Sequence, residues 1–157
     1  MVDAPACPLV LDTNIVLDLL VFDDPAVRGL RAALDCASAR WLVTAGMRDE
    51  LARVLSYPQV GSRLPAAPQA AHAVLDRFDR LSHTVAVAPL APVRCSDRDD
   101  QIFVDLAVAH RATLLSKDRQ VLRLRRRLAG LGVHVGSLSE ARFPAGWAAC
   151  SGGPASG

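Results

Sequence analysis

Aromatic side chains are scarce in this sequence: four phenylalanines, two tryptophans and one tyrosine make up only 4% of its 157 residues. This scarcity weakens any interpretation in which unpaired nucleic-acid bases stack on an aromatic platform. The formal net charge is also small, at +2, so it cannot by itself indicate a nucleic-acid-binding protein. Any binding or catalytic function therefore has to be argued from particular residues and their spacing.

Cysteine and histidine spacings typical of metal sites are missing as well. The four cysteines lie far apart without a Cys-x-x-Cys pair, and the four histidines show no metal-ligand spacing. We therefore expect reduced thiols and structural or surface histidines. No basic segment precedes a long apolar run at the N-terminus, and no run reaches the roughly 18 apolar residues of a membrane span. These absences favour a soluble, cytoplasmic protein that does not associate with membranes.

Short apolar runs alternate with segments of helical periodicity along most of the chain. Strands are expected at residues 9–11, 41–44, 84–87, 113–116 and 132–135. Helices are expected at residues 15–20, 25–34, 47–57, 71–81, 101–111 and 118–129. This order predicts an α/β fold in which helices flank a mostly parallel sheet of four or five strands, in a single domain over residues 1–143. Residues 144–157 contain mainly Pro, Ala, Gly and Ser, which predicts a disordered tail.

Two acidic residues, Asp12 and Asp118, each follow an expected strand. In open α/β sheets, ligands bind beyond the carboxyl ends of the strands, so both residues are candidates for a functional site. Asp12 has a second interpretation, because Asp, Thr and Asn all favour helix caps and the next expected helix begins just after it. The sequence leaves both interpretations of Asp12 open.

Two further carboxylates lie beside apolar helix faces. Asp100 opens an expected helix on its inward side, whereas Asp105 falls on the opposite, polar side and is expected to be solvated. Glu50 lies along the edge of the buried stripe of another helix. Because an unpaired carboxylate is costly to desolvate, Glu50 belongs either to a functional site or to a buried salt bridge with an arginine.

Carboxylates that converge at one end of a sheet repel one another and raise one another's pKa values unless a cation neutralises them. Oxygen ligands without histidine or cysteine favour a hard ion such as Mg²⁺ or Mn²⁺. Such an ion can activate water and offset the charge that develops on a phosphodiester. The residues therefore indicate metal-dependent phosphodiester hydrolysis.

Four motifs occur together in one order, and each is short and weak alone. With this order, the chain resembles the PIN-domain family, small α/β nucleases found as toxin components of VapBC-type toxin–antitoxin modules. The resemblance covers roughly residues 9–135 and implies a three-layer PIN-like fold. The motifs are Leu11-Asp12-Thr13-Asn14, Glu50-Leu51-Ala52-Arg53-Val54-Leu55, Asp99-Asp100-Gln101 leading to Asp105-Leu106-Ala107, and Leu115-Ser116-Lys117-Asp118.

The resemblance also implies roles for single residues. The catalytic and metal-binding set it implies is Asp12, Glu50, Asp100 and Asp118. Hydrogen-bonding support would come from Thr13, Asn14 and Ser116. Asp97 or Asp99 lies close enough in the sequence to replace or assist Asp100.

The activity implied by the resemblance is that of a Mg²⁺-dependent endoribonuclease, with Mn²⁺ as a possible alternative ion. An RNA substrate, an inhibiting antitoxin protein and a homodimer are the implied partners. A competing hypothesis is a catalytically silent PIN-like module that binds RNA or protein. Retention of all four acids argues against it, since a silent domain has no need of mutually repelling carboxylates.

Arginines crowd the expected helix after Asp118. Arginine binds phosphate in a bidentate manner, so Arg119, Arg123 and Arg126 are candidates for contacts with an RNA backbone. The same arginines could equally form a solvated helix face or a dock for an acidic partner.

Overall fold

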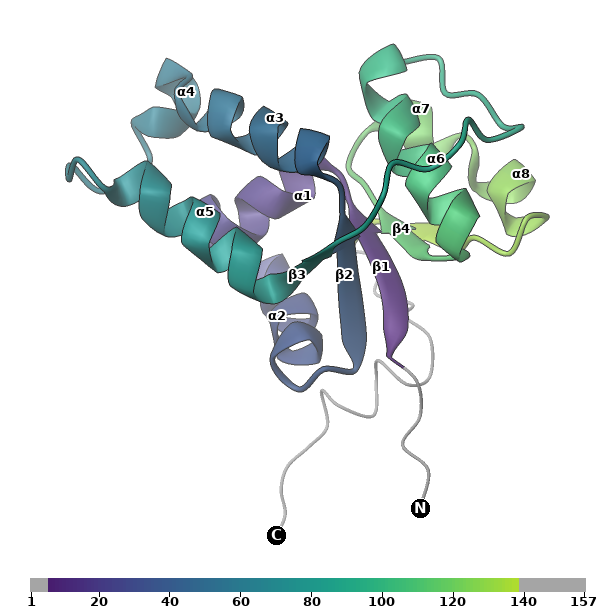
Figure 1. The fold of residues 1–157 in the computed structure, drawn as a ribbon, viewed down its shortest axis with the longest axis horizontal. Helices are drawn as coiled ribbons and strands as arrows, with labels where there is room; N and C mark the ends of the chain where they lie inside the picture. The colour runs from purple at the N-terminus through teal and green to yellow at the C-terminus, as the bar shows by residue number, and fades with distance from the viewer. Residues whose placement is uncertain (1–5, 139–157) are drawn as a thin grey trace, which may run out of the picture.

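Residues 6–138 are described in a computed structural model of the protein (Figure 1). Five strands form one sheet in the order β3-β2-β1-β4-β5, and every neighbouring pair is parallel. The strands are β1 (Cys7–Leu11), β2 (Ala39–Val43), β3 (Ser82–Thr84), β4 (Thr113–Leu115) and β5 (Val135–Gly136). The predicted α/β fold with a mostly parallel sheet is confirmed.

Helices lie on both sides of the sheet, with α1 to α5 on one side and α6 to α8 on the other (Figure 1). Two single turns of 3-10 helix, η2 (Pro25–Val27) and η3 (Arg98–Asp100), precede α2 and α6. A π-helical turn, η1 (Asp18–Phe22), continues α1. The α-helices are α1 (Thr13–Leu17), α2 (Arg28–Asp35), α3 (Ala45–Leu55), α4 (Pro58–Gly61), α5 (Ala70–Leu81), α6 (Gln101–His110), α7 (Arg119–Leu122) and α8 (Arg125–Ala129).

The strand order places a topological switch point between β1 and β4. From β1 the chain moves to β2 and β3 at one edge, then returns to β4 and β5 on the other side of β1. Because right-handed crossovers leave helices on opposite faces when the direction reverses, a crevice opens beyond the carboxyl ends of β1 and β4. The segments that follow these two strands, residues 12–14 and 116–118, therefore meet at the crevice.

The central strands are apolar because both of their faces are covered. Leu9, Val10 and Leu11 of β1 are at most 2% exposed although their side chains alternate between the two faces. On the α1–α5 side, the Trp41 and Phe78 rings meet edge to face with centroids 4.9 Å apart. This contact packs α5 against β2 on that face of the sheet.

Several predicted boundaries are wrong in ways that have a physical reason. The third strand lies at Ser82–Thr84 instead of 84–87, and the last at Val135–Gly136 instead of 132–135. β3 is a short edge strand with partly exposed polar side chains, so pairing with β2 defines it and apolar patterning does not. The short helix α4, which begins with proline at its first turn, was not predicted.

The predicted helix over 118–129 is two short helices, α7 and α8, separated at Arg123 and Leu124. Val121, Leu124 and Leu128 remain buried across the break, so the apolar stripe is continuous although the helix is not. A periodic stripe therefore does not distinguish one helix from two that pack on the same surface.

The expectation of reduced cysteines holds for Cys7 and Cys95, which are free thiols. It is wrong for Cys36, which is disulfide-bonded. Among the described residues, no helix is long and apolar enough to cross a membrane. The predicted tail over 144–157 lies outside the described residues, so it and the predicted domain boundary at residue 143 stay predictions.

Candidate active site

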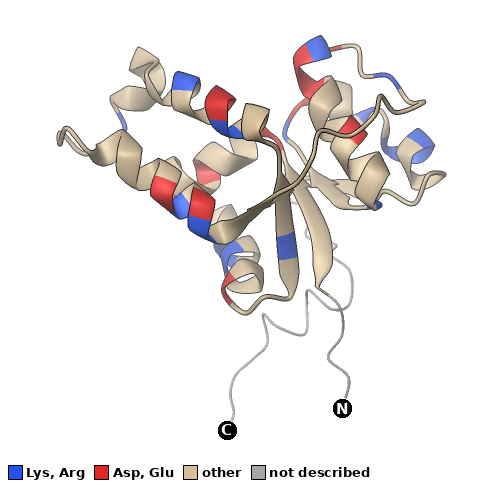
Figure 2. Cartoon of the chain, in the orientation of Figure 1, with Lys and Arg blue, Asp and Glu red and all other residues tan. Residues whose placement is uncertain are grey.

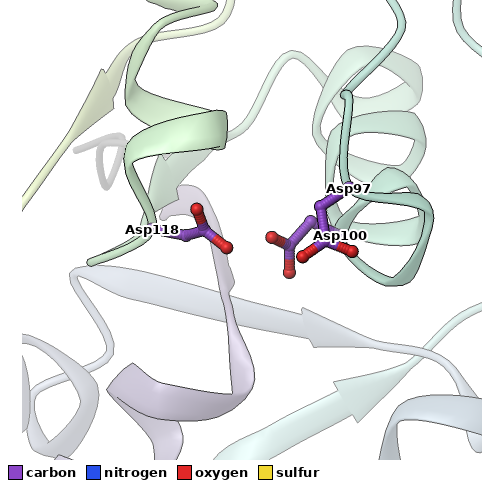
Figure 3. Close-up of side chains that lie close together, drawn as sticks. All are labelled: Asp97, Asp100 and Asp118. Atoms are coloured by element: carbon purple, nitrogen blue, oxygen red, sulfur yellow. The ribbon is translucent and has the colours of Figure 1, made fainter.

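Three carboxylates meet at the crevice beyond β1 and β4. Asp97, Asp100 and Asp118 each offer one oxygen, and these oxygens lie within 4.8 Å of one another (Figure 3). Asp97 immediately precedes η3, and Asp100 is its last residue. Asp118 comes from the turn after β4. We call these three residues the acidic cluster.

The sequence left open whether Asp97 or Asp99 accompanies Asp100, and the structure places Asp97 there. In a 3-10 turn, residues three apart project from the same side, so Asp97 and Asp100 face Asp118 together. Asp97 also caps the turn, accepting a hydrogen bond from the Asp99 amide at 2.9 Å. Asp99 itself is exposed and lies outside the acidic cluster. The three-residue spacing is a signal that could have selected Asp97 beforehand.

The acidic cluster carries more negative charge than its surroundings neutralise. Burial, followed by the hydrogen bond and charge of Asp118, raises the pKa of Asp100 to about 8. The Asp100 carboxyl in turn donates to Asp118, which, together with a hydrogen bond from the Gln120 amide, holds the pKa of Asp118 below its usual value. The two carboxyls thus share one proton when no cation is bound.

One oxygen of the Asp100 carboxyl group is buried without a hydrogen-bond partner in the described part of the chain, which is rare in proteins. Its Oδ2 atom is buried and receives no hydrogen bond from the described residues. Buried polar atoms are almost always paired, and an unpaired one requires an explanation such as an ion. An all-oxygen donor set with one unsatisfied buried oxygen fits a hard divalent cation such as Mg²⁺ or Mn²⁺.

Asp12 has a different environment, because both of its oxygens are paired. It is 3% exposed, and its Oδ1 caps α1 by accepting from the Ile15 amide at 2.9 Å. Its Oδ2 accepts from the Ser116 hydroxyl and, at 3.3 Å, from the Lys117 amide. The predicted helix cap is therefore confirmed, and Asp12 lies outside the acidic cluster. Its predicted catalytic and metal-binding role stays a prediction. Burial nevertheless raises its pKa, and the charge of Asp118 adds to this rise.

Ser116 connects Asp12 to the acidic cluster. Fully buried, it donates to Asp12 and accepts a hydrogen bond from the Asp118 amide at 3.0 Å. The next residue, Lys117, reaches the opposite way and forms an ion pair of 2.9 Å with the buried Asp18 in η1. These contacts fix the turn between β4 and α7, and with it the position of Asp118.

The other residues implied by the family motifs line a shared groove without joining the acidic cluster. Glu50 is half-buried on α3 and pairs with Arg53 at 3.1 Å in a largely solvated contact, so the expected alternative of a buried salt bridge is wrong. Thr13 and Asn14 lie at the start of α1 and line the same groove. The structure thus brings Asp100 and Asp118 together, with Glu50 apart from them.

The groove has a volume of about 830 Å³. One wall comes from α3 and the turn after it, including Glu50, Arg53 and Tyr57, and the other from η3 and the start of α6. Acidic residues occur on both walls, whereas several arginines lie away from it on α8 (Figure 2). Arg53 and Arg98 are the basic residues among those that line the groove, and sequence reasoning missed them as site residues.

Asp105 was expected to be solvated, and this expectation is wrong. It is half-buried and accepts hydrogen bonds of 2.8 Å from the Ala91 amide and from the Gln101 side chain. The Gln101 side chain also bonds the backbone of Val93 and Cys95. The polar face of α6 therefore holds the long segment that precedes η3, which positions Asp97.

The arginines expected to contact RNA are exposed on α7 and α8 and in the break between them. Arg119, Arg123 and Arg126 are not among the described residues that line the groove. Their predicted role stays a prediction.

The region that matches a known protein family contains the segments that form the site. A family model described as PIN domain matches residues 8–120, from β1 to the first residues of α7. The matched region includes all three residues of the acidic cluster and the switch point between β1 and β4. No curated protein sequence matches the chain. Since the family match spans well over half of the sequence, the chain belongs to the PIN-domain family, which has a nuclease-type fold.

Proposed function

We propose that the protein is a metal-dependent endoribonuclease, and that it acts as a toxin restrained by a cognate antitoxin. The observation that carries the enzymatic part is the buried, unpaired Oδ2 of Asp100 within a cluster of three carboxylates. The cluster lies at the switch point of a parallel sheet, where α/β proteins bind ligands. The toxin role rests on the usual context of the family.

The residues that would hold the ion are Asp97, Asp100 and Asp118, and Mg²⁺ is the hard cation that such oxygens favour, with Mn²⁺ as an alternative. When bound, such an ion lowers the pKa of water and offsets charge on a phosphodiester. Burial and the neighbouring Asp118 raise the pKa of Asp100, and a cation held by the cluster would favour loss of that proton.

The chain's own residues would orient the substrate and accept a proton. Arg53 and Arg98 line the groove and can bind the phosphates on either side of the scissile bond. Glu50 lines the groove and pairs with Arg53 through Oε2, so its Oε1 would be the oxygen that accepts a proton from the attacking water. Asp12 and Ser116 would hold Asp118 in place.

The exposed arginines Arg119, Arg123 and Arg126 extend this proposal beyond the groove, as contacts for the RNA backbone on either side of the cleaved segment. The proposed partners are RNA, an antitoxin protein and a second copy of the chain.

Cleavage of a mixed pool of structured and unstructured RNA tests the proposal, with Mg²⁺, with Mn²⁺ and with EDTA. Wild-type protein is expected to cut only with metal. Asp118→Asn is expected to abolish cutting, and Asp99→Asn provides a matched control because that carboxylate neighbours the acidic cluster without joining it. Cutting that persists in EDTA, or in the purified Asp118→Asn protein, would refute the metal-dependent mechanism.

A further inference from the structure

One face of α3 and its C-terminal turn forms a ridge along the groove. Glu50, Arg53, Val54 and Tyr57 are spaced at i, i+3, i+4 and i+7, which places them on one side of a helix, and all four line the groove. The ridge therefore presents a carboxylate, a guanidinium and an aromatic ring in order.

Tyr57 stands out because the other described aromatic side chains are covered. Trp41, Phe78 and Phe103 are buried, and Phe22 lies partly buried under the Arg63 guanidinium. Tyr57, in contrast, is 40% exposed.

The backbone around Tyr57 is also fixed. Its amide donates to the Val54 carbonyl at 3.0 Å, and it precedes Pro58, the first residue of α4. A residue before proline is restricted to extended conformations, as the Tyr57 ψ of 139° illustrates. The Tyr57 ring therefore projects from a conformationally restricted turn between α3 and α4.

The groove is negatively charged, so a nucleic acid that binds there gains from contacts that do not depend on charge. Carboxylates outnumber guanidinium groups among its lining residues, so a phosphate backbone is repelled wherever no cation is bound. Stacking of a base on an aromatic ring is worth about 1–3 kcal/mol and is little affected by this charge.

We infer that Tyr57 stacks on an unpaired base of the nucleic acid, with Arg53 binding a phosphate between that base and the acidic cluster. Tyr57 lies seven positions after Glu50, and the part of this span inside α3, from Glu50 to Leu55, rises about 7.5 Å at 1.5 Å per residue. That rise corresponds to about two stacked nucleotides at roughly 3.4 Å each. This inference rests on the proposed function, and it makes Tyr57 a residue that selects substrates with an accessible base near the cut.

Fluorescence anisotropy with a labelled single-stranded oligoribonucleotide tests the inference, using Asp100→Asn protein as the non-cleaving background. Tyr57→Leu is expected to weaken binding about 5- to 160-fold, following the stacking energy of a single base. Tyr57→Phe keeps the ring and is expected to bind within twofold of the background. Val87→Ala trims another exposed apolar side chain of the groove and is the matched control, also expected within twofold.

A set of oligonucleotides with one abasic site each locates the contact. One position is expected to lose as much affinity as Tyr57→Leu does, with no additional loss when both changes are combined. Unchanged binding by Tyr57→Leu, or an equal loss at every abasic position, would overturn the inference. Tyr57→Leu protein that binds RNA normally but changes its oligomeric state would assign the ring to a protein interface and overturn it as well.

The outcomes separate this inference from the proposed function. If wild-type protein fails to cut RNA with either metal, yet binding depends on Tyr57 and on one base, the nuclease proposal fails and the base contact stands. If wild-type protein cuts RNA and Tyr57→Leu binds it equally well, the base contact fails and the nuclease proposal stands.

Discussion

Asp12 and Asp100 lie at the same edge of the sheet, but their carboxylates have opposite surroundings. Asp12 is the more buried of the two, and each of its oxygens accepts at least one hydrogen bond. Asp100 is half-buried, faces two other carboxylates, and leaves Oδ2 unpaired. The hydrogen bonds of Asp12 stabilise the turns that it joins, whereas the unpaired oxygen of Asp100 among like charges is the feature on which the proposed cation site rests.

The largest effect on stability is expected from Asp12→Ala. The change removes the cap of α1 and leaves the buried Ser116 hydroxyl and the Lys117 amide without their acceptor. Together these losses should lower the free energy of unfolding by about 3 kcal/mol. Urea denaturation measures the change. Asp24→Ala is the matched control, because it removes only the exposed cap of η2 and should cost about 1 kcal/mol.

An Asp12→Ala protein no less stable than Asp24→Ala would mean that the Asp12 hydrogen bonds contribute little. The contrast between the two acids would then disappear.

Binding of a metal ion to the acidic cluster should increase the stability of the folded protein, whereas Asp12→Ala should decrease it. An ion that binds only the folded state adds about 2.7 kcal/mol at a concentration 100 times its Kd. Thermal unfolding with Mg²⁺ or Mn²⁺ measures this gain, which Asp118→Asn should reduce and Asp99→Asn should leave intact. An equal gain in all three proteins would show that the ion binds elsewhere.

Asp100→Asn should stabilise the metal-free protein. The folded-state pKa of Asp100, about 8, lies above its ordinary value of 3.8, so its contribution to stability is fully present below about pH 4 and is lost as the pH rises through 8. Asparagine removes this loss, because it carries no charge at either pH. At pH 8 in EDTA we expect a gain of about 1 kcal/mol, typical of replacing a strained functional residue.

Urea denaturation of wild type and Asp100→Asn at pH 4 and pH 8 checks the sign. The difference in stability between the two proteins should shift in favour of Asp100→Asn as the pH rises. A difference that does not change with pH would show that Asp100 is not held protonated by its neighbours.

Local patterns predicted much of this arrangement. The apolar run ending at Asp12 and the helix beginning after Asp100 follow from residues adjacent in sequence, and the sheet follows from their alternation. The polar edge strand β3 could not be predicted in this way, because only its pairing with β2 makes it a strand.

The site required information that lies outside each local window. Asp105 was misplaced because the segment that covers it comes from 14 residues earlier in the chain. Cap and ligand interpretations of Asp12 could not be separated, since both place an acid just after a strand and before a helix. The positions of Ser116 and Lys117, more than 100 residues away, show how Oδ2 of Asp12 is paired, and the predicted catalytic role of Asp12 stays a prediction.

The smallest effect on stability is expected from Glu50→Gln. The Glu50 carboxylate is neither buried with both oxygens hydrogen-bonded, as Asp12 is, nor part of the acidic cluster, as Asp100 is. Its ion pair with Arg53 is largely solvated, with 38% and 61% of the two side chains exposed. Pairs of this kind contribute about 0–1 kcal/mol, so the free energy of unfolding should barely change.

Cleavage should nevertheless fall by about 10²- to 10⁴-fold if Glu50 accepts a proton from the attacking water. Asp49→Asn, on the neighbouring exposed position of α3, should alter neither stability nor cleavage and provides the control. Full activity in Glu50→Gln would restrict the chemistry to the acidic cluster and leave Glu50 as a surface residue of the groove.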